Sequence, residues 1–150
     1  MKIIEYSRAH RLSFKKLNEE WLKKYFNVEP YDSTLLENCE SEIINKGGYI
    51  FFGIIDNEVM GTYALLPPVN GRTELGKMAV TESYQGKGYG QQLLKHALST
   101  AKSLGIKEIF LFSNRILKNS IYIYKKFGFK EVENVDSPYK RGNIKMLAKL

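Results

Sequence analysis

The sequence is poor in the residues that form disulfides and bind metals. It has one cysteine, Cys39, and two histidines, His10 and His96, in 150 residues. A single cysteine excludes an internal disulfide, and its position on an apolar helical face predicts a buried core side chain rather than a nucleophile. The two histidines are far apart in the sequence and no Cys/His cluster exists, so we expect no metal site.

Long apolar runs are also missing. No stretch approaches the ~18 apolar residues that a membrane span requires, and no charged segment followed by an apolar one opens the sequence. We therefore expect a cytoplasmic protein that makes no use of a membrane. Repeats, low-complexity tracts and linkers are absent, so we expect residues 1–150 to form a single domain with a hydrophobic core.

Acidic residues are in the minority, with 16 Asp and Glu against 23 Lys and Arg, which gives a net charge of +7. A basic balance favours a polyanionic partner. Nucleic acid is one alternative, but the basic residues are spread along the chain and no nucleic-acid-binding signature is present. We therefore expect no nucleic acid and prefer a cleft that binds a phosphorylated small molecule.

A glycine-rich loop follows the apolar strand predicted for residues 72–80. Residues 85–90 read Gln-Gly-Lys-Gly-Tyr-Gly and open an amphipathic helix that runs to about Leu104. Glycines let a backbone pass close to a ligand, and the free N–H groups at a helix start bind anions. The loop therefore predicts a phosphate or pyrophosphate site beside the end of a strand.

Two known phosphate-loop patterns fit this loop poorly. A P-loop requires Ser or Thr after Gly-Lys, whereas Gly88 follows Lys87 here. A dinucleotide-binding fingerprint requires Gly-x-Gly-x-x-Gly and a carboxylate at the end of the next strand, but position 91 is Gln91 and that strand ends without a carboxylate. A third pattern, Gln-x-x-Gly-x-Gly after a strand that ends in Val80, matches the loop.

This third pattern resembles the acyl-CoA-binding motif of the GNAT superfamily of N-acetyltransferases. Gln85, Gly88 and Gly90 occupy its fixed positions. Residues 119–129, Asn-Ser-Ile-Tyr-Ile-Tyr-Lys-Lys-Phe-Gly-Phe, resemble the next helix of the family with its Tyr-x-Lys-x-Gly-Phe ending. The two motifs stand in the expected order, and the resemblance covers nearly the whole chain.

Hydrophobic spacing and turn residues predict the element order β-α-α-β-β-β-α-β-α-β-β. Helical spacing indicates a first helix over residues 10–26 that Pro30 stops, and a second helix that starts with a capping box of Thr34 and Glu37. Strands are predicted over residues 2–6, 49–55, 58–66, 72–80, 107–113, 129–135 and 143–150, and a further helix over residues 117–127. The resemblance implies an α/β fold, a GNAT-like mixed, mostly antiparallel sheet with helices on both faces. In the family, the strands that match 72–80 and 107–113 splay apart to admit acetyl-CoA.

By resemblance, acetyl-CoA is the acyl donor, and its three phosphate groups suit the basic charge. The implied cofactor-binding residues are Met78, Ala79, Val80, Gln85, Gly86, Lys87, Gly88, Tyr89, Gly90, Gln91, Asn114, Asn119 and Lys126. The first three would pair through their backbone with the pantetheine arm and the thioester, and the amides from 85 to 91 would hold the pyrophosphate. For Asn114, the role of a turn cap is an equal alternative.

Tyr124 is the candidate general acid for the leaving thiolate. It lies four residues before Gly128, where the family places its tyrosine, and a phenol with a pKa near ~10 suits a thiolate of similar basicity. The alternative is a core residue, because Tyr124 shares a helical face with Leu117 and Ile121. Its neighbour Tyr122 points elsewhere on the helix.

Glu74 is the candidate general base that takes a proton from the acceptor ammonium. It lies six residues before Val80 in the strand that lines the acceptor side. Strand alternation places Glu74 on the face of Met78 and Val80, although the bulge that family members often carry in this strand would change that facing. The alternative is an exposed strand carboxylate.

The acceptor site is implied by resemblance at the first two helices and the loop between them. The candidate residues there are Trp21, Tyr25, Phe26 and Tyr31, with Asp32 as a further candidate. An aromatic-lined pocket favours a small amine over a long peptide. We therefore expect an acetyl-CoA-dependent N-acetyltransferase that moves the acetyl group directly to the primary amine of a small molecule in a ternary complex.

Three alternatives stay open at this point. The chain is a protein or peptide N-acetyltransferase, a non-catalytic acyl-CoA-binding sensor, or a basic nucleic-acid-binding module. The predicted edge strands near residue 150 also leave a homodimer as an alternative to a monomer.

Overall fold

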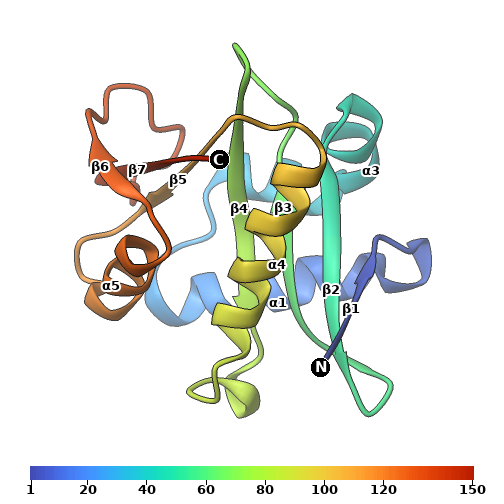
Figure 1. Ribbon diagram of the computed structural model, residues 1–150. Coiled ribbons are helices and arrows are strands. Elements are labelled where there is room, and N and C mark those ends of the chain that lie inside the picture. Colours follow the sequence, from blue (N-terminus) through green and yellow to red (C-terminus); the bar gives the residue numbers. More distant parts are fainter.

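A mixed sheet of seven strands organises the computed structural model, which describes residues 1–150. The strands are β1 (Lys2–Glu5), β2 (Tyr49–Ile55), β3 (Glu58–Leu65), β4 (Arg72–Val80), β5 (Glu108–Ser113), β6 (Lys130–Val132) and β7 (Ile144–Lys149). They lie in the order β1-β2-β3-β4-β5-β7-β6 (Figure 1). Only β4 and β5 run parallel, so the predicted mixed and mostly antiparallel sheet is confirmed.

Helices cover both faces of this sheet, as predicted. They are α1 (Arg11–Tyr25), α2 (Pro30–Glu37), α3 (Cys39–Glu42), α4 (Tyr89–Ser103) and α5 (Lys118–Lys126). Alternate residues of β2 separate the two cores, because successive side chains of a strand point to opposite faces. Ile50 and Phe52 pack with Phe14 of α1, whereas Phe51 packs with Leu93 of α4. Figure 1 shows α4 on the near face and α1 behind the sheet.

The parallel strands β4 and β5 separate after a short contact. Their pairing covers only Arg72–Glu74 of β4, opposite residues 108–110 of β5. Beyond Glu74, β4 keeps β3 as its neighbour on one edge and has no strand on the other, while β5 continues along β7. The edge of β4 from residue 75 to Val80 therefore presents unpaired backbone groups to the gap.

A β-bulge at Lys77 changes the facing of β4. Lys77 has a φ of 53°, and the register against β3 shifts by one residue there. Met78 and Val80 pack toward the α4 core, whereas Glu74 and Lys77 lie on the α1 and α2 side with the polar groups described below. The strand-alternation prediction that Glu74 shares a face with Met78 and Val80 is wrong, because the extra residue reverses the alternation.

The start of the second helix is also corrected. α2 begins at Pro30 rather than at Thr34, and its capping box is formed by Glu29 and Asp32. The Glu29 N–H donates to Asp32 Oδ2 at 2.9 Å, and proline is well suited to the first helical position. Two acidic residues therefore form the cap that we assigned to Thr34 and Glu37, and this places both carboxylates beside the site described next.

Candidate active site

A groove of about 700 Å³ lies where β4 and β5 separate. One wall is formed by the end of β4 and the glycine loop, and the other by the segment that leads into α5 and by α5 itself. The predicted cofactor-binding and catalytic residues that line it are Met78, Ala79, Val80, Gln85, Gly86, Gly88, Gly90, Gln91, Asn119 and Tyr124. Backbone of the β4 edge and of the loop thus faces one continuous space.

The glycine loop leaves the start of α4 uncovered. Gly86 and Gly88 have φ values of 75° and 84°, a left-handed conformation that favours glycine, and Gly88 is the N-cap of α4. A Cβ on Gly90 would meet no atom within 4 Å, so there is open space beside this residue. The Gln85 side chain donates to the Val80 carbonyl at 2.9 Å and ties the loop to the strand end. The helix itself leaves the N–H groups of its first turn without partners, and N–H groups of this kind can bind an anion.

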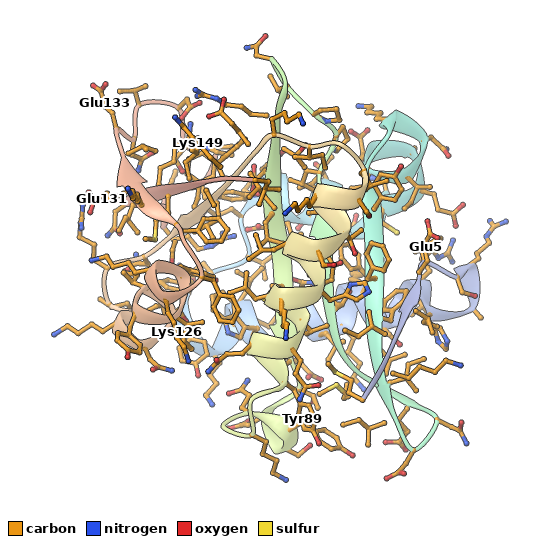
Figure 2. The ribbon with its side chains drawn as sticks, in the orientation of Figure 1. Glu5, Tyr89, Lys126, Glu131, Glu133 and Lys149 are labelled. Carbon is orange, nitrogen blue, oxygen red and sulfur yellow. The ribbon has the colours of Figure 1, made fainter.

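Other predicted cofactor residues lie less centrally. Lys87 stands over the Tyr84 ring at 5.7 Å, and neither Lys87 nor Tyr89 lines the groove. Lys126, near the end of α5, also lies outside the lining, and Figure 2 shows it far from Tyr89 at the start of α4. Lys118 does line the groove. We did not predict it, although it directly precedes the motif residue Asn119.

The Asn114 side chain acts as a turn cap in this structure. Its Oδ1 accepts from the Ile116 N–H at 3.0 Å, and its Nδ2 donates to the Arg141 carbonyl at 2.8 Å. Asn114 thereby fixes the turn after β5 to the loop before β7. It also lines a second, smaller cavity, so the capping role and a ligand contact are compatible.

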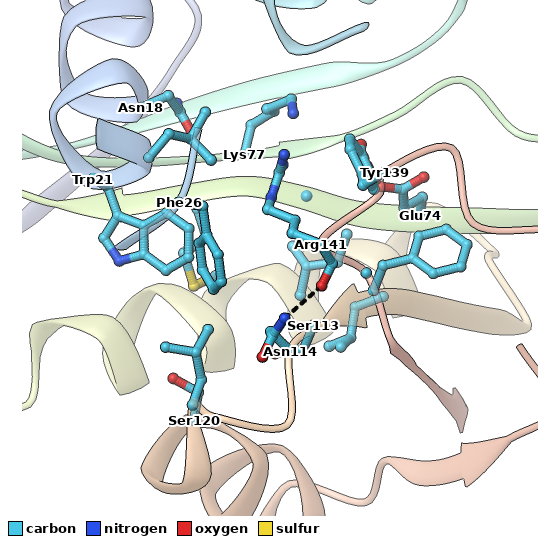
Figure 3. Close-up of a pocket in the computed structure, with 18 of the residues that line it drawn as sticks. Asn18, Trp21, Phe26, Glu74, Lys77, Ser113, Asn114, Ser120, Tyr139 and Arg141 are labelled. Carbon is cyan, nitrogen blue, oxygen red and sulfur yellow. Dashed lines mark hydrogen bonds between the residues drawn. The ribbon is translucent and has the colours of Figure 1, made fainter. Parts of the chain in front are cut away.

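This second cavity, the inner pocket, has a volume of about 110 Å³ and adjoins the groove. Five residues line both spaces: Trp21, Met78, Leu117, Ser120 and Tyr124. The inner pocket continues between α1, the middle of β4 and the loop before β7 (Figure 3). A molecule in the inner pocket would therefore meet a molecule in the groove at the wall that contains Tyr124.

Glu74 lies buried in the inner pocket, where 9 % of the residue is exposed. The Tyr139 hydroxyl donates to Glu74 Oε2 at 3.0 Å. Burial raises the pKa of the carboxyl to about 7, while the hydrogen bond from Tyr139 and the charge of Lys77 oppose the increase. The exposed-carboxylate alternative is wrong, and a carboxyl with this pKa exchanges a proton readily near neutral pH.

Tyr124 is half-buried at the junction of the two cavities. Its ring meets Phe129 edge-on, with centroids 5.8 Å apart, and it packs against the α4 core. Burial raises the pKa of its phenol, so the hydroxyl keeps its proton at neutral pH. The core interpretation therefore describes its packing, and the general-acid role stays a prediction. Tyr122, by contrast, is 68 % exposed and lines neither cavity.

An ionic cluster that the sequence did not predict closes the inner pocket. Arg141 binds Asp32 with two hydrogen bonds, Nη1 to Oδ2 at 2.7 Å and Nη2 to Oδ1 at 2.8 Å. Lys77 Nζ also donates to Asp32 Oδ1, and Arg141 Nη1 donates to Glu29 Oε2 at 3.1 Å. The Tyr139 ring lies under both cations, 4.7 Å from Lys77 Nζ and 4.6 Å from the Arg141 guanidinium carbon. The cluster joins the capping box of α2 to the loop before β7.

Charge pairing decides the ionisation of this cluster. Burial alone would raise the pKa of Asp32, but the hydrogen bonds from Arg141 and the charge of Lys77 hold it at about 2. Burial lowers the pKa of Lys77, against the opposing effect of Asp32. Asp32 is therefore an anion at neutral pH, and its side chain is completely inaccessible, so it shapes the pocket from behind the wall.

The predicted acceptor aromatics divide between the two cavities. Trp21 lines both and Phe26 lines the inner pocket, whereas Tyr25 lines only the groove. Tyr31 lines neither cavity and packs against Tyr139, with ring centroids 5.5 Å apart. Tyr139, Arg141 and Asn18 line the inner pocket without having been predicted. The first two lie in a loop that carries no motif, and Asn18 interrupts the apolar spacing of α1 as a buried amide.

The comparisons with known proteins agree on one family. The model of the acetyltransferase (GNAT) family matches residues 13–129. The chain is 30 % identical over 131 residues to the uncharacterized N-acetyltransferase YvbK of Bacillus subtilis, covering 85 % of this chain and 83 % of the relative. It is 25 % identical over 127 residues to the ribosomal protein bS18-alanine N-acetyltransferase of Haemophilus influenzae, covering 85 % and 82 %.

Solved structures give the same result for the fold. An acetyltransferase of the GNAT family from Staphylococcus aureus Mu50 superposes with a TM-score of 0.87 at 26 % identity, covering 99 % of this chain and 98 % of that one. The PaiA N-acetyltransferase of Thermoplasma acidophilum, solved in complex with coenzyme A, superposes with a TM-score of 0.76 at 22 % identity over 99 % and 98 %. No helix has the length and apolar character to cross a membrane, and no group of His, Cys, Asp and Glu is arranged to hold a metal ion.

Proposed function

The chain belongs to the acetyltransferase (GNAT) family and is an acetyl-CoA-dependent N-acetyltransferase, and we propose that its acceptor is the primary amine of a small molecule. The observation that carries this proposal is the junction of the two cavities. A groove lined by the glycine loop adjoins an inner pocket of about 110 Å³ that holds Glu74, and five residues line both. Donor and acceptor would meet there in one ternary complex.

On the donor side, the proposal uses backbone groups. The N–H groups at the start of α4 would hold the pyrophosphate of acetyl-CoA, and the uncovered edge of β4 would pair with the pantetheine arm. Lys118 lines the same groove and adds a positive charge. These contacts support acetyl-CoA as the donor and require no metal.

On the acceptor side, Glu74 and Tyr124 would move the protons. Glu74 takes a proton from the acceptor ammonium, the neutral nitrogen attacks the thioester carbon, and backbone N–H groups of the β4 edge stabilise the charge on the carbonyl oxygen. The C–N bond forms and the C–S bond breaks. Tyr124 donates its proton to the leaving thiolate, and the new amide nitrogen gives its extra proton back to the Tyr124 phenolate through solvent. Glu74 then releases the proton that it took from the ammonium to solvent. No acyl-enzyme is needed, because Cys39 is buried outside both cavities.

A second candidate acceptor is the terminal amine of a protein. The Haemophilus influenzae relative, which by its name acts on an alanine of a ribosomal protein, favours this candidate. The small volume of the inner pocket favours the small molecule, because the pocket leaves no room for a long side chain. A non-catalytic sensor would bind acetyl-CoA without turnover.

Calorimetric titration with acetyl-CoA and with CoA, at two salt concentrations, followed by thiol-release assays with a panel of amines, tests this function. We expect about 1:1 binding in the micromolar range and thiol release with small primary amines. Binding of acetyl-CoA without thiol release in the presence of any amine would favour the non-catalytic sensor. Failure to bind either compound would contradict the proposal, and salt-dependent binding of DNA or RNA that CoA does not displace would support the nucleic-acid module.

A further inference from the structure

The acceptor pocket contains an arginine with a free hydrogen-bonding edge. Arg141 uses Nη1 for Glu29 and Asp32 and Nη2 for Asp32. Its Nε–H and the second Nη2 hydrogen have no partner in the protein, and these two groups lie on the same edge of the planar guanidinium. Such an edge matches the two oxygens of a carboxylate. Arg141 lines the inner pocket, and 16 % of its side chain is exposed.

The position of this arginine relative to the base is suitable for a compact ligand. In Figure 3, Arg141 stands between Phe26 and Trp21 on one side and Glu74 and Tyr139 on the other. The Asp32 and Glu29 carboxylates hold the far end of the guanidinium, and the Tyr139 ring covers one of its faces. The guanidinium is therefore fixed before any ligand binds, which reduces the entropic cost of binding.

A polar acceptor atom lies on the opposite wall. The Asn18 amide donates from Nδ2 to the Phe14 carbonyl at 3.0 Å, while its Oδ1 accepts no hydrogen bond from the protein. Asn18 is 3 % exposed and lines the inner pocket. A carbonyl oxygen that has no protein partner can accept from an N–H group of a ligand. Glu74 and Asn18 Oδ1 thus provide two acceptors for an amine.

The charges around the pocket restrict the acceptor further. Lys77 and Arg141 are balanced by Asp32 and Glu29, so Glu74 is the one carboxyl in the pocket wall that is not held by an ion pair. A single ammonium can be matched by Glu74. A second ammonium on the same molecule would meet Lys77 and Arg141 instead, and like charges brought together in a buried site are costly.

We propose that the acceptor carries a carboxylate close to its amine, as an amino acid does, with the carboxylate on the free edge of Arg141 and the amine between Glu74 and Asn18 Oδ1. This inference rests on the proposed function and names the substrate class of the same site. It assigns Arg141 to specificity rather than to proton transfer. Diamines and polyamines are excluded by the same arrangement of charge.

A matched acceptor panel tests the proposal. The twenty L-amino acids, their carboxamides, their decarboxylated monoamines and 1,4-diaminobutane are each assayed for thiol release with saturating acetyl-CoA. We expect the best free amino acid to exceed its carboxamide and its decarboxylated amine by at least about tenfold in kcat/KM, because a charge-assisted pair is lost. The diamine should be a poorer acceptor than either.

Two variants separate recognition from folding. Arg141→Lys keeps the positive charge beside Asp32 and removes the bidentate edge, so KM for the free amino acid should rise about tenfold while KM for the carboxamide stays within about twofold. Glu131→Gln removes an exposed pair with Arg115, and neither residue lines the groove or the inner pocket. This control should preserve the acid-to-amide ratio. A purely structural role for Arg141 would lower turnover of acid and amide alike and leave their ratio unchanged in Arg141→Lys.

Other outcomes overturn the inference and leave the proposed function intact. Equal turnover of acids and amides, or a preference for 1,4-diaminobutane, would show that no carboxylate is recognised. The same conclusion would follow if acetyl-CoA bound in the calorimeter and no free amino acid released thiol. Failure of the protein to bind acetyl-CoA at all would instead contradict the proposed function itself.

Discussion

The groove and the inner pocket are built in opposite ways. The wall of the groove that we propose binds the donor comes from one continuous stretch, residues 78–91, and in this proposal it acts through backbone groups. The inner pocket is held by side chains that are remote in sequence. Asp32 and Lys77 are 45 residues apart, Glu74 and Tyr139 are 65 apart, and Asp32 and Arg141 are 109 apart.

This difference indicates that substitutions can change the inner pocket without changing the groove. Backbone amides at a helix start bind a phosphate whatever the neighbouring side chains are, provided that glycines keep them uncovered. The inner pocket depends on a few side chains that each have a specific partner. Substitutions in the inner pocket would change which acceptor is bound without disturbing the donor site. We therefore expect acetyl-CoA binding to tolerate substitutions in the inner pocket.

The largest effect is expected for Asp32→Asn, which disrupts the ionic cluster at the inner pocket and leaves the groove unchanged. Lys77 and Arg141 would lose their shared counter-ion in a buried place, so the free energy of unfolding should fall by about 3–5 kcal/mol. Urea denaturation at pH 7 measures it. The matched control is Glu131→Gln, which removes the exposed pair with Arg115 and should cost less than about 1 kcal/mol.

Equal destabilisation by these two substitutions would mean that the cluster is not a buried ion network. The same measurement repeated with saturating acetyl-CoA separates the two regions further. Folded Asp32→Asn should still be stabilised by acetyl-CoA, because no group of the cluster lines the groove.

Tyr124→Phe is expected to have the next largest effect, at the wall that the two cavities share. Removal of the phenolic proton should lower kcat by about 10²-fold, the range of general acid catalysis, with little change in KM for acetyl-CoA. Steady-state kinetics with the best acceptor measure both constants. Tyr122→Phe is the control, because this exposed tyrosine of the same helix lines neither cavity. An unaltered kcat in Tyr124→Phe would remove the residue from the mechanism.

The smallest effect is expected for Gly90→Ala, which tests the donor side of the groove. Gly90 lies in the first turn of α4 with no positive φ and with open space at its Cβ position, so Gly90→Ala should stabilise the fold by up to about 1 kcal/mol. The added methyl group would stand in the groove, so affinity for CoA should fall by about tenfold. Thermal unfolding measures the expected gain in stability, and calorimetry measures the expected loss of CoA affinity.

Ser99→Ala provides the control for that experiment, because Ser99 is an exposed position of α4 outside the groove. It should raise helix stability slightly and leave CoA affinity unchanged. If Gly90→Ala also left affinity unchanged, no phosphate would approach the backbone there.

The sequence predicted the groove well because its signals are local. The strand over residues 72–80, the glycine loop and the following helix appear in the structure at nearly the predicted positions. The turn between β2 and β3 is equally local, because Asp56 and Asn57 are adjacent and both have positive φ values. In each case the residues that determine the conformation are neighbours in the chain, so spacing and turn chemistry are sufficient.

The inner pocket was predictable only in part. Glu74, Trp21 and Phe26 were predicted and line it. The facing of Glu74, however, depends on the bulge at Lys77, and no residue type in β4 predicts a bulge.

The residues around the ionic cluster were harder to predict. Asp32 was a candidate ligand contact and proves to be buried behind the wall. Tyr139 and Arg141 follow Ser137 and Pro138 in a loop whose position is set by pairing with α2, which is tertiary information. Our incorrect prediction of the cap of α2 has the same origin, because the two acidic residues that form the cap also bind Arg141, which is remote in the sequence.

The central claim is that Glu74 in the inner pocket is the base for a donor bound in the groove, and the pH–rate profile of Glu74→Gln tests it most directly. A carboxyl with a pKa of about 7 is protonated and inactive at low pH, so kcat/KM of the unsubstituted protein should rise with pH through about 7 as the carboxylate forms. Glu74→Gln should lose this rise and fall by about 10²-fold at pH 8, with acetyl-CoA affinity unchanged. Superimposable profiles of the two proteins would contradict the account.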